Sequence, residues 1–173
     1  MRFKLRFAPK AIDEIAARYS FQEDTGALEA GEQIREGRCT RGNLERIFEW
    51  KTNGRGRSRL AKNSDGEIAD ALNLAMTAKT DRAAVAVLVG LNGVQVPVAS
   101  AILTAINPER FTIIDFRALE ALSVQQVPIT INFYLEYLNE CRTLARRNNH
   151  SLRTFDRALW QWSKDQATIS RSR

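Results

Sequence analysis

Asp115 is an acidic residue within an apolar segment, FTIIDFRAL, where it precedes a predicted helix. A carboxylate held at the mouth of a pocket can activate a water molecule or stabilise a developing cation. Aspartate is also a preferred N-cap residue, so a purely structural role fits the same position. Under both interpretations the segment 113–122 places Asp115 at the start of a short helix.

A glycine-bearing turn precedes this acid by about twenty residues, in GLNGVQVPVASAIL. The pattern predicts two helices over residues 83–106 joined by a tight turn, with Gly93 supplying the positive φ that the turn needs. Unpaired N–H groups at the start of the second helix can bind a phosphate. The predicted backbone contacts to DNA are Asn92, Gly93, Val94, Gln95 and Val96. An ordinary αα-hairpin, in which glycine is common, is the alternative.

A basic segment without acids, KTNGRGRSRLAKN, follows Trp50 at residues 51–63. Guanidinium and ammonium groups in such a segment can neutralise phosphates, so we predict DNA contacts by Lys51, Arg55, Arg57 and Arg59. Trp50 either stacks on a base or wedges into the duplex, or it packs in the core. Trp160 has the same two interpretations, as a pocket-lining aromatic or as a core residue.

The composition fits a globular domain with a polyanionic partner. The chain has 173 residues, 44% of them hydrophobic, and a net charge of +6. This length predicts one domain, 1–173, with one or two lobes. Two distant cysteines and a single histidine do not form the clusters that metal sites need, so we expect neither a metal nor a cofactor.

Helical periodicity dominates the chain and predicts an all-α fold of about eight helices. RFKLRF at residues 2–7 alternates basic and apolar residues and is predicted to be a short strand or an extended arm. Residues 20–39 contain three glycines and mixed charge, so we predict a loop or short helical turns there. Asp156 and Asp165 are predicted to be charges on a helix surface.

The long uncharged stretch from Ala83 to Pro108 is interrupted in its middle by polar residues, a glycine and a proline. We therefore interpret it as two buried helices and expect no membrane association. The N-terminal segment MRFKLRFAPK lacks the apolar core of a signal peptide. A cytoplasmic location is expected, with association to the nucleoid if the organism is bacterial.

The order LNGVQVPVASAIL and then IIDFRAL resembles the helix-hairpin-helix DNA glycosylases, the HhH-GPD superfamily. The similarity covers residues 83–122. It implies a two-lobed all-α fold, in which amides of the hairpin hold the DNA backbone, a flipped base enters a pocket, and Asp115 assists cleavage of the N-glycosidic bond.

Three positions depart from the pattern of that superfamily. Gln95 stands where a second glycine is usual, and Asn92 stands where proline is frequent. Pro97 stands where bifunctional members have a catalytic lysine, so the resemblance implies a monofunctional enzyme. The chain also lacks the four cysteines of the iron–sulfur members.

The sequence thus predicts a monofunctional DNA N-glycosylase of the base-excision-repair type. We expect it to act as a monomer on damaged or distorted double-stranded DNA. One alternative is a non-catalytic helix-hairpin-helix DNA-binding module, in which Asp115 is only a cap. A second alternative is a helical protein-interaction domain whose positive charge keeps it in solution.

Overall fold

The computed structural model describes residues 3–21, 24–125 and 127–171, and all regular elements in these ranges are helical. This confirms the predicted all-α class, with ten α-helices in the described ranges where about eight were predicted. The elements are η1 (Pro9–Ala11), α1 (Ile12–Ala17), α2 (Thr25–Arg35), α3 (Arg41–Thr52), α4 (Arg57–Leu60), α5 (Asp65–Thr77), α6 (Asp81–Val89), α7 (Val96–Ile106), α8 (Phe116–Ala121), α9 (Ile131–Arg147) and α10 (Leu152–Arg171).

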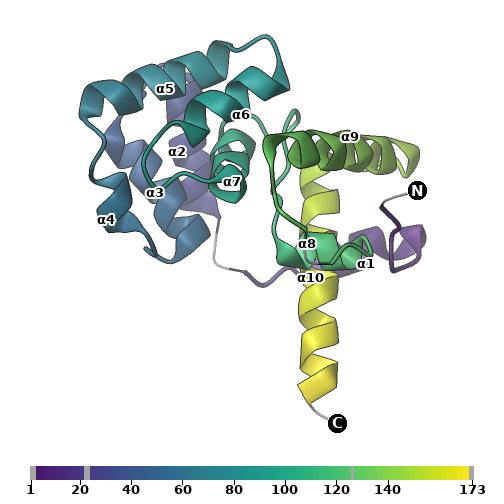
Figure 1. Cartoon of the computed structure of the whole chain (residues 1–173). Helices are drawn as coiled ribbons and strands as arrows, with labels where there is room; N and C mark the ends of the chain where they lie inside the picture. Colours follow the sequence, from purple (N-terminus) through teal and green to yellow (C-terminus); the bar gives the residue numbers. More distant parts are fainter. Residues whose placement is uncertain (1–2, 22–23, 126, 172–173) are drawn as a thin grey trace.

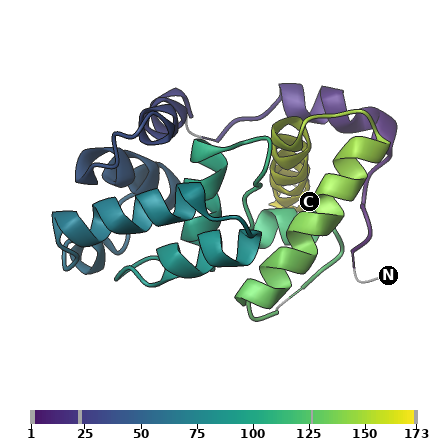
Figure 2. The same cartoon turned by 90° about the horizontal axis from the view of Figure 1, so that it is seen from above.

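The helices form two lobes (Figure 1). In the first lobe, which contains α2 to α7, α2 and α3 pack against α7, and α5 packs against α6. In the second lobe α1 and α8 pack against the long α10, and α9 also contacts α10. The view from above shows the same division (Figure 2). The chain enters the first lobe before α2 and returns to the second through a link, residues 107–115, that makes a turn at 108–110 and is extended from 111 to 115.

Local capping signals in the sequence correctly predicted several helix starts. Thr40 and Thr80 each accept a hydrogen bond from the backbone N–H three residues ahead, and Ser64 forms a complete capping box with Glu67. Pro97 lies in the first turn of α7, where its missing N–H costs little. Helices whose caps are explicit in the sequence therefore begin where predicted.

The prediction of a loop or short helical turns over residues 20–39 was wrong, because α2, a helix of 11 residues, occupies most of that segment. Its buried residues are Ala27, Ala30, Gly31 and Ile34, which have helical spacing. Small residues and glycines made this periodicity weak as a hydrophobic signal. Gly31 is required by packing, since a Cβ atom there would lie 2.0 Å from the carbonyl oxygen of Ala105 on α7.

Two other segments also differ from their predictions. The basic segment is not wholly a loop, because a single turn of helix, α4, buries Leu60 within it. The N-terminal segment is an extended arm in the described residues 3–7, and no strand is present in the described ranges. The backbone N–H groups of Lys4 and Arg6 donate to the carbonyls of Leu122 and Ala121 at the end of α8, both at 2.9 Å. Arg2, where the predicted strand or arm began, lies outside the described residues.

A carboxylate between two arginines joins the lobes at one point of their boundary. Asp81, the first residue of α6, lies 2.8 Å from Arg110 in the link and 2.6 Å from Arg142 on α9. Burial alone would raise the pKa of Asp81, but hydrogen bonds from both arginines outweigh burial and lower it. The carboxylate therefore stays ionised and holds α6, the link and α9 together.

Two glycine substitutions in α2 test its packing against α7. Gly31→Ala should lower the free energy of unfolding by about 3 kcal/mol or more, because its methyl group would overlap the backbone of α7. Gly26→Ala, in the same helix, adds a Cβ that has no described atom within 4 Å beyond its chain neighbours and its own helix backbone, so it should raise stability by about 0.4–1 kcal/mol. Denaturant unfolding of both variants measures the difference. Similar effects from the two substitutions would contradict the close approach of α2 to α7.

Candidate active site

The extended link is fixed in place by two buried tyrosines of α9. Tyr134 and Tyr137 donate hydrogen bonds to the backbone carbonyls of Thr112 and Ile113, at 2.9 and 2.7 Å. Both tyrosines are fully buried, so these bonds form without competition from water. They set the direction in which the chain approaches Asp115.

A third contact and the helix cap complete the placement of Asp115. The backbone N–H of Ile114 donates to Ser100 Oγ on α7 at 3.1 Å. Asp115 Oδ1 then accepts the backbone N–H of Ala118 at 3.0 Å, which makes Asp115 the N-cap of α8. The structural role considered for Asp115 is thus real, and it leaves the second carboxylate oxygen available.

That second oxygen pairs with Lys51. Lys51 Nζ lies 3.2 Å from Asp115 Oδ2, and the two side chains are only 13% and 20% exposed. Lys51, which is predicted to contact DNA, reaches in this structure from α3 across the lobe boundary to the carboxylate. Asp115 therefore has apolar neighbours in the sequence, but in the folded protein a cation, Lys51, lies beside it.

Asp115 and Lys51 line a pocket of about 330 Å³ at the boundary of the lobes. This volume is near the lower end of the range for small-ligand sites. Five aromatic residues line it, and four of their rings meet edge to face: Phe21 lies 5.9 Å from Trp50 and 5.3 Å from Trp160, and Tyr19 lies 5.3 Å from Trp160. Aromatic walls beside a carboxylate suit a flat, polar ligand. The other lining residues are Asn53, Arg55, Ile113, Phe116, Arg117 and Asp156.

Both tryptophans predicted as pocket or wedge residues line this pocket. Trp50 is only 8% exposed, and its ring packs in the pocket wall. Its Nε1 group is buried and has no hydrogen-bond partner among the described residues. Trp160 is half-buried and has Arg117 and Lys164 over its ring at 5.2 and 5.3 Å.

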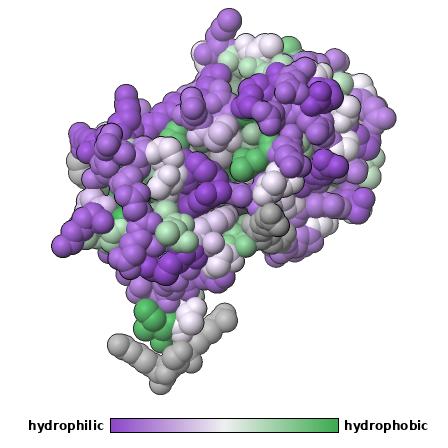
Figure 3. All heavy atoms as spheres, turned by 180° about the vertical axis from the view of Figure 1, so that it is seen from behind, coloured by the Kyte–Doolittle hydropathy of each residue, from purple (hydrophilic) through white to green (hydrophobic). Residues whose placement is uncertain are grey.

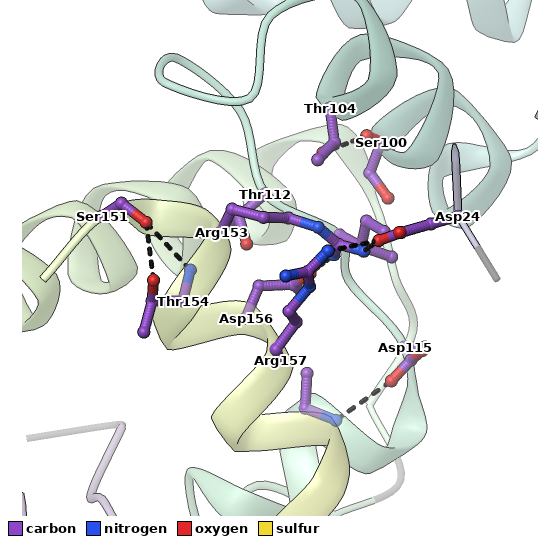
Figure 4. A network of polar contacts seen from close by, with 12 residues as sticks. Asp24, Ser100, Thr104, Thr112, Asp115, Ser151, Arg153, Thr154, Asp156 and Arg157 are labelled. Carbon is purple, nitrogen blue, oxygen red and sulfur yellow. Dashed lines mark hydrogen bonds and ion pairs between the residues drawn. The ribbon is translucent and has the colours of Figure 1, made fainter. Parts of the chain in front are cut away.

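A buried network of charges lies beside the pocket (Figure 4). Arg153 on α10 contacts Asp24 and Asp156, and Arg157 lies 2.9 Å from Asp24. Burial alone would raise the pKa of Asp24, but hydrogen bonds from both arginines outweigh it, so the pKa lies below its ordinary value. Asp24 directly precedes α2, so this network ties the first lobe to α10.

Asp156 was predicted to lie on a helix surface, and this prediction was wrong. Its side chain is buried at the pocket wall. Burial raises the pKa of Asp156, the positive charge of Arg153 partly offsets this, and the negative charge of Asp115 adds to the increase. Asp165 is partly buried and lies 3.1 Å from Arg18, which directly follows α1.

The turn between α6 and α7, residues 90–95, is held against the basic segment. Gly93 has a φ of +84°, and a Cβ atom there would lie 3.0 Å from the backbone nitrogen of Leu60. Asn63 fastens the two segments: its Oδ1 accepts the backbone N–H of Asn92 at 2.8 Å, and its Nδ2 donates to the carbonyl of Asn92 at 3.1 Å. The predicted backbone site therefore depends on a residue that the sequence analysis did not identify.

Of the five residues predicted to contact DNA in this turn, the side chains of Val94 and Val96 are buried. Asn92 uses its backbone and its amide on Asn63. Within the described chain the backbone N–H groups of Gly93, Gln95 and Val96 donate no hydrogen bond to another residue. What the turn offers a ligand is thus backbone donors and the exposed side chain of Gln95.

These donors face a groove of about 1120 Å³ that Arg55 and Arg59 also line. Neither arginine forms a salt bridge with any described residue. Arg57, predicted as an equivalent contact, instead lies 2.8 Å from Glu49 and is absent from the groove. Because Arg55 lines both the groove and the pocket, the two hollows adjoin.

Several residues that the structure adds to the site were not predicted from the sequence, among them two aromatic residues before α2 and the two residues after Asp115. Tyr19 and Phe21 belong to no motif or helical pattern in the sequence, because they lie in the segment between α1 and α2 that joins the lobes. Phe116 and Arg117 directly follow Asp115 in the sequence, and that adjacency was a usable signal. Burial raises the pKa of Tyr19 to about 12, so its hydroxyl is neutral at physiological pH.

Within the described ranges no group of three or more His, Cys, Asp or Glu side chains is arranged to hold a metal ion. No described helix has both the length and the apolar character needed to cross a membrane. Comparison with protein-family models gave no match, and neither did comparison with curated proteins or with solved structures. Function is therefore argued from the geometry of the site.

Removing the charge of Asp24 tests the network beside the pocket. Asp24→Asn leaves two largely buried arginines without a counter-charge, so at pH 7 the free energy of unfolding should fall by about 3 kcal/mol. Because the pKa of Asp24 is lowered in the folded protein, its stabilisation is present above the ordinary value of 3.8 and is lost as pH falls through the folded pKa. The difference between wild type and variant should therefore shrink at pH 3.

Denaturant unfolding at both pH values measures this effect. Asp70→Asn, at an exposed position on α5, is the matched control and should change stability by no more than about 0.5 kcal/mol. An equal loss at pH 7 and pH 3 would contradict the ionic role of Asp24.

Proposed function

We propose that this protein binds damaged or distorted double-stranded DNA and is a monofunctional DNA N-glycosylase. The observation that carries the proposal is the position of Asp115, in an aromatic-walled pocket that adjoins a basic groove with free backbone donors. The resemblance of residues 83–122 to the helix-hairpin-helix glycosylases supports the same assignment. Neither a metal nor an organic cofactor is needed for this chemistry.

The groove is the proposed site for the DNA backbone. Arg55 and Arg59 have no acidic partner in the described chain, so each is available to neutralise a phosphate. The N–H groups of Gly93, Gln95 and Val96 add uncharged donors at the start of α7. These contacts position the duplex and carry no sequence preference, which suits a protein that searches for damage.

The pocket is the proposed site for a base that has left the stack. Its aromatic walls favour a planar ring, and its volume fits one small ligand. As the bond from C1′ to the base nitrogen breaks, positive charge develops on the sugar, and the Asp115 carboxylate stabilises it. Water then forms the new C1′–O bond and loses a proton, while the departing base gains one.

Lys51 bears on the choice between monofunctional and bifunctional chemistry. Pro97 occupies the position at which bifunctional members of the superfamily have a catalytic lysine. Lys51, by contrast, places an amine 3.2 Å from the proposed catalytic carboxylate. In a monofunctional enzyme Lys51 holds the carboxylate in position and forms no covalent bond to the sugar. Borohydride reduction in the presence of abasic DNA distinguishes the two, because only an imine is trapped.

Two other functions remain as alternatives. In a non-catalytic DNA-binding module only the groove would contact DNA, and Asp115 would serve only as the N-cap of α8. Asp115 does accept the capping hydrogen bond from the backbone N–H of Ala118. A protein-interaction domain would be expected to present a broad apolar surface. The face seen from behind is mostly hydrophilic, with small separate hydrophobic areas among the described residues (Figure 3).

The salt dependence of DNA binding tests the groove. Arg55→Ala combined with Arg59→Ala should flatten the slope of log affinity against log salt by about two units, because two phosphate contacts are lost. Fluorescence anisotropy of a labelled duplex at several salt concentrations gives the slope. Arg57→Ala is the matched control, since Arg57 is paired with Glu49 outside the groove, and it should change the slope far less. If Arg57→Ala flattened the slope by about one unit, as much as is expected for each arginine of the groove, this division would be contradicted.

A charge-removing substitution tests the chemistry of Asp115. Asp115→Asn keeps an oxygen that can cap α8, so the fold and the affinity for DNA should be retained, although stability should fall because Lys51 loses its counter-charge. Base release from a panel of damaged duplexes should fall about a hundredfold or more, because the lost charge acts on the transition state. Release is measured by alkaline cleavage of the abasic product.

Lys51→Met is the companion variant, since it removes the ion pair and leaves the Asp115 carboxylate in place. If neither the wild type nor Asp115→Asn releases any base while both bind DNA, the non-catalytic module is the better account. Trapping of a covalent adduct by borohydride in the wild type, lost in Lys51→Met, would overturn the monofunctional assignment.

A further inference from the structure

Phe116 is the only aromatic side chain of the described residues that is largely exposed. It is 69% exposed, and it is the first residue of α8, directly after Asp115. Exposing a phenyl ring to water forgoes the stabilisation that its burial would give. The exposed ring therefore has no evident role in holding the fold together.

The other aromatic residues near the pocket cannot reach a partner outside the protein in this way. Trp50 is buried, while Tyr19, Phe21 and Trp160 contact each other edge to face and form the pocket wall. A side chain that enters a base stack must stand free of such contacts. Phe116 alone among them meets that condition.

The surroundings of Phe116 carry the complementary charge for DNA. The guanidinium of Arg117 lies 5.0 Å from the centre of the Phe116 ring and 5.2 Å from that of Trp160. Arg55, which lacks an acidic partner in the described chain, lines the same pocket as Phe116. An apolar ring set among cations suits a partner that combines phosphates with stacked bases.

The position of Phe116 relative to the hollows defines what it could do. It lines the pocket of Asp115 and also a neighbouring hollow, formed by residues of α8 and the segment that follows it. Ile129 lines both that second hollow and the basic groove. Phe116 thus lies between the pocket and the second hollow, and the second hollow shares Ile129 with the basic groove.

We propose that Phe116 is the wedge that enters the duplex and fills the space left by the extruded nucleotide. This inference rests on the proposed function and assigns the role considered for Trp50 to a different residue. Because Phe116 and Asp115 are consecutive, a base displaced by the ring is delivered next to the carboxylate. Phe116 is a positioning residue, and it takes no part in bond cleavage.

The test compares binding to two duplexes of one sequence, one intact and one with a tetrahydrofuran abasic analogue. The wild type should prefer the abasic duplex, in which one base is already missing from the stack. Phe116→Ala should lower affinity for the abasic duplex by roughly 5- to 100-fold, the range for loss of one base–aromatic stack, and should change affinity for the intact duplex little. Phe116→Trp should restore the preference.

Leu74→Ala provides the matched control. Leu74 on α5 is 57% exposed and lies outside all three hollows, so its removal should leave both affinities unchanged. The melting temperature of Phe116→Ala should equal that of the wild type, because the ring is exposed.

The possible outcomes separate the wedge from the proposed function. If the wild type binds neither duplex, the DNA-binding proposal falls and the wedge falls with it. If the wild type binds DNA without preferring the abasic duplex, the wedge alone is overturned. Retention of that preference in Phe116→Ala, or an equal loss on both duplexes, likewise overturns the wedge and leaves DNA binding intact.

Discussion

Two carboxylates, each shared between a pair of arginines, link the two lobes beside the pocket. Asp24 pairs with Arg153 and Arg157 of α10, and Asp81 pairs with Arg110 and Arg142. Each carboxylate belongs to the first lobe, and three of the four arginines belong to the second. A single buried carboxylate and a single arginine often balance only their own desolvation. The sharing of each carboxylate lowers its pKa, so both stay ionised as the lobes meet.

The residues of the site depend on this junction in different ways. Trp50 and Lys51 come from the first lobe, whereas Asp115 and Trp160 come from the second. Asp115 would still cap α8 if the lobes separated, but it would lose Lys51 and the opposite aromatic wall. The cap is a local property of the sequence, and the proposed active site is a property of the assembled fold.

The sequence predicted those features that depend on local physics. The all-α class followed from periodicity, and Asp115 at the start of α8 followed from N-cap preference. By contrast, the sequence did not reveal α2, because most residues of its buried face are alanine or glycine. Such small residues let two helices approach closely, but they produce only a weak hydrophobic pattern. The contact of Lys51 with Asp115 joins residues 64 positions apart, and no short-range pattern encodes such a contact.

The attachment of the α6–α7 turn to the basic segment has a consequence for the thermodynamics of ligand binding. Asn63 and the close approach at Gly93 fasten the turn with the free amides to the backbone at Arg59 and Leu60. The conformational entropy of ordering that backbone is therefore lost during folding, before any anion arrives. An anion in the groove has only the arginine side chains left to order, so the amides contribute to affinity without an accompanying loss of backbone freedom.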